Sequence, residues 1–223
     1  MIKTRRGFTL VELMITMVIM VILTTLAVVI TGNIQTQARD NEREQDIQML
    51  ARGLEIRYTK LSAYTIPSNT PGNPPQKISV SQGKYPGDNE MWQWGWYRSI
   101  PNNNIFVGAS DEAIMSPSGE RLGYVCPLAG LDTEADPLKK CDTGEKPYNI
   151  KKAFTNSDGS LRDIYLYEST TYDKRYCNND PVWNGADDCT RFNLYWISET
   201  DKTIDPKYPN IPGLKILRSK HQQ

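Results

Sequence analysis

An almost uninterrupted run of apolar residues lies near the N-terminus, from Phe8 to Ile30. Glu12 is the only charged residue in this run, which also lacks glycine and proline. A continuous helix over the run would be about 35 Å long, enough to cross a hydrocarbon core of roughly 30 Å. Three cations precede the run and none lies inside it. We therefore predict a membrane-spanning helix whose N-terminal end stays in the cytoplasm.

A second helical segment is predicted over residues 33–62, which contain no proline. Its first part, from Asn33 to Asp46, is strongly polar. An apolar stripe with the i, i+3/i+4 spacing of a one-sided helix then follows. It consists of Ile47, Leu50, Ala51, Leu54, Tyr58 and Leu61. We expect this stripe to dock on a globular head, with Gly32 as a weak point between the two helical segments.

The composition changes after Leu61. Residues 66–90 are rich in Pro, Gly, Asn and Ser, which predicts a long irregular connection. Short β-strands are then predicted at Met91–Tyr97, Arg121–Cys126, Asp163–Glu168, Phe192–Ile197 and Leu214–Leu217. A helix followed by antiparallel strands indicates an α+β fold.

Three tryptophans alternate along the first of these predicted strands. Trp92, Trp94 and Trp96 would share one side of it, with Gln93 and Gly95 between them. Aromatic residues at this spacing form either the buried face of a strand or a platform for a ligand. We favour the buried face, because aromatic side chains are enriched in strands that pack on a core.

Charge and histidine content restrict the function. Lys and Arg together number 26, as do Asp and Glu, so the formal net charge is zero and no nucleic-acid partner is expected. The single histidine, His221, lies in the C-terminal tail. No Walker-type or Rossmann-type glycine loop is present, and we expect no enzymatic activity.

Four cysteines lie outside the apolar run, at Cys126, Cys141, Cys177 and Cys189. Three pairings are possible, of which we favour Cys126–Cys141 and Cys177–Cys189, because each closes a short loop. Each bond would contribute about 3 kcal/mol in the loop-entropy model. A zinc site is disfavoured because no C-x-x-C spacing occurs. Disulfides indicate an exported domain.

Two acidic loops are weak candidates for calcium. One offers Asn156, Asp158 and Asp163 around a glycine, and the other contains Asp180, Asp187 and Asp188. Clusters of Asn, Asp, Gly and Ser are also ordinary turn chemistry, and the EF-hand spacing is absent. We expect no cofactor, with calcium left as the alternative.

The segment Arg5-Arg6-Gly7-Phe8-Thr9-Leu10-Val11-Glu12-Leu13, with the apolar run behind it, resembles the N-terminus of type IV pilins and type II secretion pseudopilins. The resemblance implies that a prepilin peptidase cuts after Gly7 and that Phe8 becomes an N-methylated N-terminus. A glycine suits the cut, because no side chain obstructs the backbone. The chain would divide into a leader (1–7), a membrane and polymerisation helix (8–31), a stalk helix (32–62) and an extracellular head (63–223). The resemblance also implies that the polar residues 33–46 of the stalk face solvent or other subunits.

The same resemblance gives Glu12 a purpose, because a charge in a membrane helix costs about 2.5–3.5 kcal/mol. It implies that Glu12 pairs with the N-terminal ammonium of a neighbouring subunit. The partners would be the inner-membrane assembly platform and other pilin subunits. The protein would first be single-pass in the cytoplasmic membrane, then part of a surface or periplasmic filament. Many major pilins carry a helix breaker within the membrane helix, and its absence here favours a minor or specialised subunit.

A different interpretation remains open. The chain could be a membrane-anchored extracellular binding protein or adhesin that never polymerises. It would keep residues 1–7 and make no use of Glu12.

Overall fold

The computed structural model describes residues 9–60, 63–66, 76–79, 83–87, 90–91, 94, 101–125, 150–172, 177 and 188–220. The side chains of residues 27–31, 33, 63–66, 76–79, 125 and 152 are outside this description.

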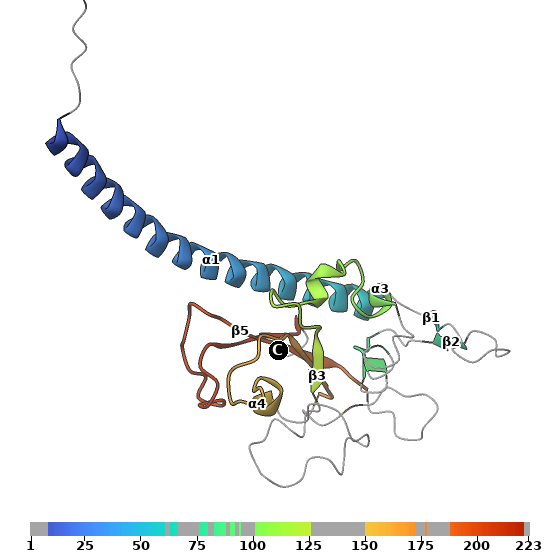
Figure 1. Cartoon of the computed structure of the whole chain (residues 1–223). Coiled ribbons are helices and arrows are strands. Elements are labelled where there is room, and N and C mark those ends of the chain that lie inside the picture. The colour runs from blue at the N-terminus through green and yellow to red at the C-terminus, as the bar shows by residue number, and fades with distance from the viewer. Residues whose placement is uncertain are drawn as a thin grey trace, which may run out of the picture.

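A single long helix, α1 (Leu10–Lys60), dominates the molecule. Its N-terminal part projects from the head, and its C-terminal part lies along the head (Figure 1). The two predicted helical segments therefore form one helix, which runs through Gly32 without a break. The absence of proline explains this continuity, because no residue in α1 lacks the N–H that the ladder of helical hydrogen bonds needs.

The head is built on a four-stranded sheet in the order β3-β4-β5-β6. Its strands are β3 (Gly123–Val125), β4 (Leu166–Thr170), β5 (Arg191–Ile197) and β6 (Leu214–Arg218). The α+β fold is thus confirmed, but the expectation of purely antiparallel strands is wrong, because β3 pairs with β4 in parallel. The other two pairings are antiparallel. Strand β4 also begins three residues later than the predicted strand.

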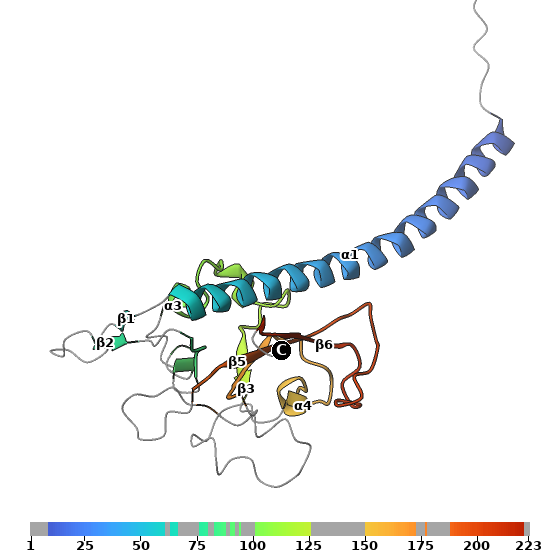
Figure 2. The same cartoon turned by 180° about the vertical axis from the view of Figure 1, so that it is seen from behind.

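The sheet is covered on both faces, since successive side chains along a strand point to opposite sides. Phe192 and Leu194 of β5 face α1 and pack with its buried stripe of Ile47, Leu50, Ala51 and Leu54. Tyr195 and Ile197 face the other way, toward α4 (Ile150–Ala153) and the segment after β5. Figures 1 and 2 show α1 and α4 on opposite sides of the strands. The predicted docking of the stripe is therefore confirmed, while Leu61 lies outside the described residues.

The strand predicted at Met91–Tyr97 is wrong where the structure describes it. Met91 and Trp94 have helical backbone and are buried, so they share one face at the i, i+3 spacing of a helical turn. The Trp94 ring packs edge-on against the Phe106 ring, with the ring centroids 5.5 Å apart. Trp94 is therefore part of the core, as the interpretation of the tryptophans as a buried face predicts. The alternation of the tryptophans was misleading because a period of two over so few residues does not exclude a helical turn. Trp92 and Trp96 lie outside the described residues.

The connection after α1 is not wholly irregular. Strands β1 (Ala63–Ile66) and β2 (Gln76–Ser79) pair antiparallel as a small separate sheet. The prediction of an irregular segment over residues 66–90 is therefore wrong at Ile66 and throughout β2. Its prolines lie between the paired segments or beyond them. Two short helical elements, α3 (Asn102–Ile105) and η1 (Glu112–Ile114), contact α1 from the head.

Two turns in the head have the same hydrogen bonds and lie forty positions apart in the chain. In the first, the Ser116 N–H donates to the Glu120 carbonyl and the Gly119 N–H to the Ser116 carbonyl, both at 2.8 Å. In the second, the Asn156 N–H donates to the Ser160 carbonyl at 2.9 Å and the Gly159 N–H to the Asn156 carbonyl at 3.0 Å. Both glycines have positive φ, at 84° and 82°, which a residue with a side chain rarely adopts.

Candidate processing and assembly site

The helix α1 begins with a capping box at Thr9 and Glu12. The Thr9 N–H and hydroxyl both donate to Glu12 Oε2 at 2.9 Å, and the Glu12 N–H donates to Thr9 Oγ1 at 3.3 Å. These bonds satisfy N–H groups that the first turn of a helix leaves without partners. The carboxylate of Glu12 therefore points toward the N-terminal end of its own helix. Gly7 and Phe8 lie outside the described residues.

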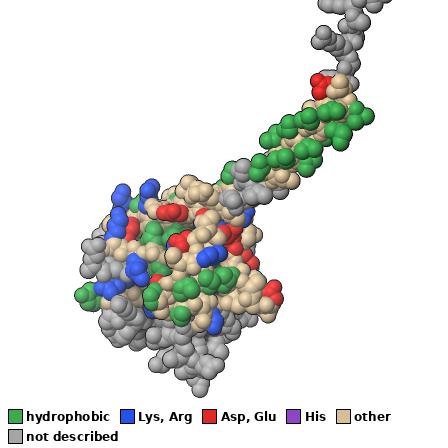
Figure 3. Space-filling view, turned by 90° about the vertical axis from the view of Figure 1, so that its left-hand side faces the viewer, with side chains coloured by type: hydrophobic (Ala, Val, Ile, Leu, Met, Phe, Trp, Pro, Cys, Tyr) green, Lys and Arg blue, Asp and Glu red, His purple; other side chains and the backbone are tan. Residues whose placement is uncertain are grey.

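Residues 10–26 of α1 expose apolar side chains on every side of the helix, and we call this surface the apolar sleeve. Its large apolar side chains are between 48 and 77 % exposed, and they cover the rod that projects from the head (Figure 3). Its threonines donate to helical carbonyls at 2.7–2.9 Å, so their hydroxyls need no outside partner. A helix that is apolar all round is typical of one buried by lipid or by other helices.

Among the residues that the structure describes, no helix is both long enough and apolar enough to cross a membrane.

The polar part of α1 binds the head through a charged cluster, which we call the Arg43 cluster: Arg39, Asp40, Arg43, Asp163 and Glu199. The Arg43 guanidinium donates to Asp40 at 2.7 Å, to both carboxylate oxygens of Asp163 at 3.0 Å and to Glu199 at 2.5 Å. Only 2 % of Arg43 is exposed. The expectation that residues 33–46 face solvent or other subunits is therefore wrong at Asp40 and Arg43.

Two carboxylates of the Arg43 cluster, those of Asp40 and Glu199, are held ionised. Burial opposes this at Asp40, but hydrogen bonds from Thr200, the Glu199 N–H and Ser198 outweigh it and lower the pKa of Asp40. Hydrogen bonding from Arg39, with a further contribution from Arg43, lowers the pKa of Glu199 to about 2. Charge on both groups therefore favours the docked position of α1 at neutral pH.

A second charged contact lies at Arg57, beyond the buried apolar stripe of α1. The Arg57 guanidinium donates to Glu90 at 2.7 Å and to the Asn104 carbonyl at 2.6 Å. Between the two contacts, the backbone of Phe106 and Val107 approaches Gly53 so closely that a Cβ there would lie 2.8–3.0 Å from its atoms. The head therefore holds α1 by charge at both ends of the docked segment and by close packing between them.

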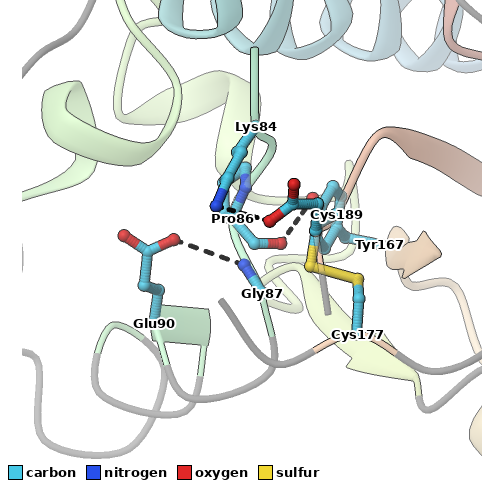
Figure 4. Close-up of a disulfide and its surroundings, with 8 residues drawn as sticks. Lys84, Pro86, Gly87, Glu90, Tyr167, Cys177 and Cys189 are labelled. Atoms are coloured by element: carbon cyan, nitrogen blue, oxygen red, sulfur yellow. Dashed lines mark hydrogen bonds and ion pairs between the residues drawn. A yellow bond between two sulfur atoms is a disulfide. The ribbon is translucent and has the colours of Figure 1, made fainter. Parts of the chain in front are cut away.

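A disulfide joins Cys177 to Cys189 in the head, the pairing favoured from the sequence. The segment leading from the helix to the sheet lies against it (Figure 4). The Tyr85 N–H donates to the Cys189 carbonyl at 2.7 Å, and the Tyr167 hydroxyl donates to the Pro86 carbonyl at 2.8 Å. The disulfide thus closes a short loop just before β5 begins, and the two hydrogen bonds hold the segment of Tyr85 and Pro86 beside it. Cys126 and Cys141 lie outside the described residues, so their pairing stays a prediction.

The structure separates the calcium candidates. Asp158 accepts hydrogen bonds from the Ser160 N–H and hydroxyl, within the exposed second turn. Asn156 is in the same turn, whereas Asp163 binds Arg43. The first turn forms the same bonds without an Asp at the corresponding position, Ser118, so the shape needs no metal. Within the described chain, no group of three or more His, Cys, Asp or Glu side chains is arranged to hold a metal ion.

The comparisons with known proteins bear on the N-terminus. Residues 2–28 match the prokaryotic N-terminal methylation motif, the prepilin-type signal of type IV pilins and pseudopilins. This motif contains Gly7, Phe8 and Glu12 and ends inside the apolar part of α1. No curated protein and no solved structure matches the chain.

The chain therefore carries the N-terminus of a pilin-like or pseudopilin precursor, followed by a long helix and an α+β head. The motif implies processing by a prepilin peptidase, association with pilin subunits and a membrane-anchored precursor. Sequence reasoning missed the Arg43 cluster. The available signal was the i, i+3 spacing of Asp40 and Arg43, but the acceptors Asp163 and Glu199 are more than a hundred residues away in the chain.

Proposed function

We propose that this protein is a structural subunit of a type IV pilus-like filament. It is cut by prepilin peptidase after Gly7, methylated at Phe8 and assembled by packing of its N-terminal helices. The observation that carries the proposal is the coincidence of the methylation motif with the apolar sleeve, which the rest of the described chain leaves uncovered.

The sleeve needs a cover because contiguous exposed apolar surface is costly in water. In the precursor this cover is the membrane, and in the filament it is a bundle of the same helices from other subunits. The assembly platform of the inner membrane carries out the transfer. The head, with its disulfide, is on the far side of the membrane and is finally exposed on a surface or periplasmic filament.

The capping box gives Glu12 a place in assembly. One carboxylate oxygen already accepts from Thr9, but an ionised carboxylate has about four lone-pair sites and can accept an ammonium as well. The capping bonds hold the carboxylate at the level of the N-terminus, where the Phe8 ammonium of a neighbouring subunit would arrive. Removing one partner from an ion pair in an apolar bundle costs about 3–5 kcal/mol.

Mass spectrometry of the N-terminal peptide tests the processing step. A methylated peptide that begins at Phe8 is expected. An intact peptide that begins at Met1 in a natural membrane preparation would contradict the proposal and support the anchored binding protein instead. The Gly7→Val variant should remain uncut, because the added branched side chain obstructs the scissile bond. Its maturation to the wild-type mass would show that the cut lies elsewhere.

The Glu12→Ala variant tests assembly separately from processing. It should insert in the membrane and be cut normally, while its share of filament-associated protein falls in cells without a wild-type copy. Glu44→Ala is the matched control, because it removes an exposed carboxylate from the docked part of α1. Equal incorporation of the Glu12→Ala variant and the control would refute the ion pair as the assembly device.

A further inference from the structure

Three buried arginines occur in the described part of the chain, and they differ in their partners. Arg43 is 2 % exposed and Arg57 is 1 % exposed, and each donates to carboxylates. Arg191 is 9 % exposed, yet its guanidinium makes no hydrogen bond or ion pair with any described residue. Its Nε–H is fully buried, and none of the described residues accepts a hydrogen bond from it. A buried donor left in this state destabilises the fold, and more strongly when it is charged.

The surroundings of Arg191 hold it in a defined position. It is the first residue of β5 and forms the last pair of the β4–β5 ladder, opposite Thr170. The Thr190 N–H extends the ladder by donating to the Thr170 carbonyl at 3.1 Å. The disulfided Cys189 lies two residues earlier in the chain. The guanidinium is therefore carried by the sheet and the disulfide, elements suited to a preorganised site.

The guanidinium of Arg191 lies over the ring of Tyr172. The Tyr172 ring lies 4.3 Å from the Arg191 guanidinium carbon, while 73 % of the residue is exposed. An aromatic ring stacked on a guanidinium covers one of its faces and leaves its N–H edge available to a planar acceptor. The exposed ring marks the side from which an acceptor can approach.

Another stacked arginine in the head shows what a purely structural pair looks like. The guanidinium carbon of Arg121 lies over the Trp94 ring, also at 4.3 Å. Arg121, however, donates to Asn102 Oδ1 at 3.1 Å, and the same oxygen accepts from the Trp94 indole at 2.8 Å. The Arg121 pair thus carries its own acceptor, whereas the Arg191 pair lacks one among the described residues.

We propose that Arg191 and Tyr172 form a binding site for an oxyanion of the carboxylate or phosphate type. The guanidinium fork supplies parallel N–H donors, which match two oxygens of such a group, and the tyrosine ring borders the entry. The bound oxyanion supplies the acceptors that the described residues do not. This site is independent of Glu12 and of filament assembly, and it places ligand recognition at the loop end of β4 and β5.

Titration calorimetry on the full chain in detergent micelles tests the site, with inorganic phosphate and acetate as separate probes at constant ionic strength. The wild type should bind at least one probe, and Arg191→Gln should weaken that binding at least about tenfold. Arg191→Lys should also weaken it, because a point charge lacks the fork. Arg52→Gln is the matched control, since it removes an exposed arginine on α1 and should bind as the wild type does.

The relative affinities identify the ligand chemistry. Tighter binding of acetate assigns a carboxylate, and tighter binding of phosphate assigns a phosphoryl group. Thermal unfolding and the Cys177–Cys189 peptide serve as folding checks, and Arg191→Lys replaces Arg191→Gln if the latter fails them. Absence of binding to the wild type, or equal binding by every Arg191 variant that folds, would overturn the proposal.

Discussion

The two parts of α1 meet their surroundings in opposite ways. From Leu10 to Leu26 the described polar side chains are satisfied within the helix, while the apolar ones are exposed. Between Arg39 and Arg57 an apolar stripe is buried against the head, and charged side chains contact the head as well. The stripe consists of Ile47, Leu50, Ala51 and Leu54. The C-terminal part of the helix is thus completed by its own chain. In the N-terminal part only the hydrogen bonds are complete, because no other segment of the described chain covers its apolar side chains.

The comparison predicts that a charge deletion is most harmful where the head encloses the charge. Arg43→Met should lower the free energy of unfolding of the head by up to about 3–5 kcal/mol, the range for breaking a buried ion pair. The reduction is smaller to the extent that its acidic partners, with side chains 13–31 % exposed, are solvated. Urea unfolding in micelles, followed by tryptophan fluorescence, measures this change.

Arg39→Met is the control for that measurement. Arg39 shares Glu199 with Arg43, but its side chain is 40 % exposed. A pair of this kind contributes under about 1 kcal/mol. Equal effects of the two substitutions would show that burial of Arg43 does not decide the stability of the docked helix.

A methyl group should be harmful in the docked part of α1. Gly53→Ala would bring its Cβ to 2.8 Å from the Phe106 carbonyl carbon and 2.9 Å from the Val107 nitrogen. Backbone atoms cannot rotate away, so α1 must shift from the head, at a cost of about 1–3 kcal/mol. The same urea titration measures the effect. A variant as stable as the wild type would contradict the close packing of α1 on the segment after α3.

Glu168, the buried acid of the sheet, should change the stability of the head with pH in the opposite direction to Glu199 of the Arg43 cluster. Glu199, with its pKa lowered to about 2 from 4.5, stabilises the fold above pH 4.5 and loses this contribution as the pH falls toward 2. Burial raises the pKa of Glu168 despite hydrogen bonds from Tyr195 and Asn193, so its ionisation at higher pH lowers stability.

Glu168→Gln should therefore be at least as stable as the wild type at pH 7, and its advantage should vanish as the pH falls below 4.5. The amide oxygen can still accept from Tyr195 and Asn193, which keeps the packing. Thermal unfolding at several pH values gives the difference. Glu44→Gln, on the exposed face of α1, should show no such trend, and a flat profile for Glu168→Gln would refute the charge burial.

The smallest effect is expected at the glycine between the two parts. A Cβ at Gly32 would meet nothing within 4 Å, so Gly32→Ala should only favour the helix, by up to about 1 kcal/mol. Protease cleavage near this position should become slower, while the unfolding of the head stays unchanged. A loss of head stability would show that Gly32 contacts the head after all.

Elements with strong local patterns were predictable. The helical period from Ile47 to Leu54, the β-rich run of β5 and the apolar block at the N-terminus depend on neighbouring residues. The structure has a helix, a strand and a helix at these three places. Elements that depend on residues far away in the chain could not be predicted in this way. The parallel pairing of β3 with β4 and the helical state of Trp94 follow from packing against other segments, which local alternation does not record.

The same physical division applies to the candidate sites. The sequence by itself determined the methylation motif, the charge order across the apolar run and the capping pair Thr9–Glu12. Each of these depends only on residues that lie close together in the chain. Only the tertiary structure decided that Arg43 would be enclosed by acids from two distant loops and that Arg191 would be buried with a tyrosine as its described side-chain contact. Charged side chains look alike in a sequence. Their energies are decided by solvent exposure and by partners that the folded chain brings from far away.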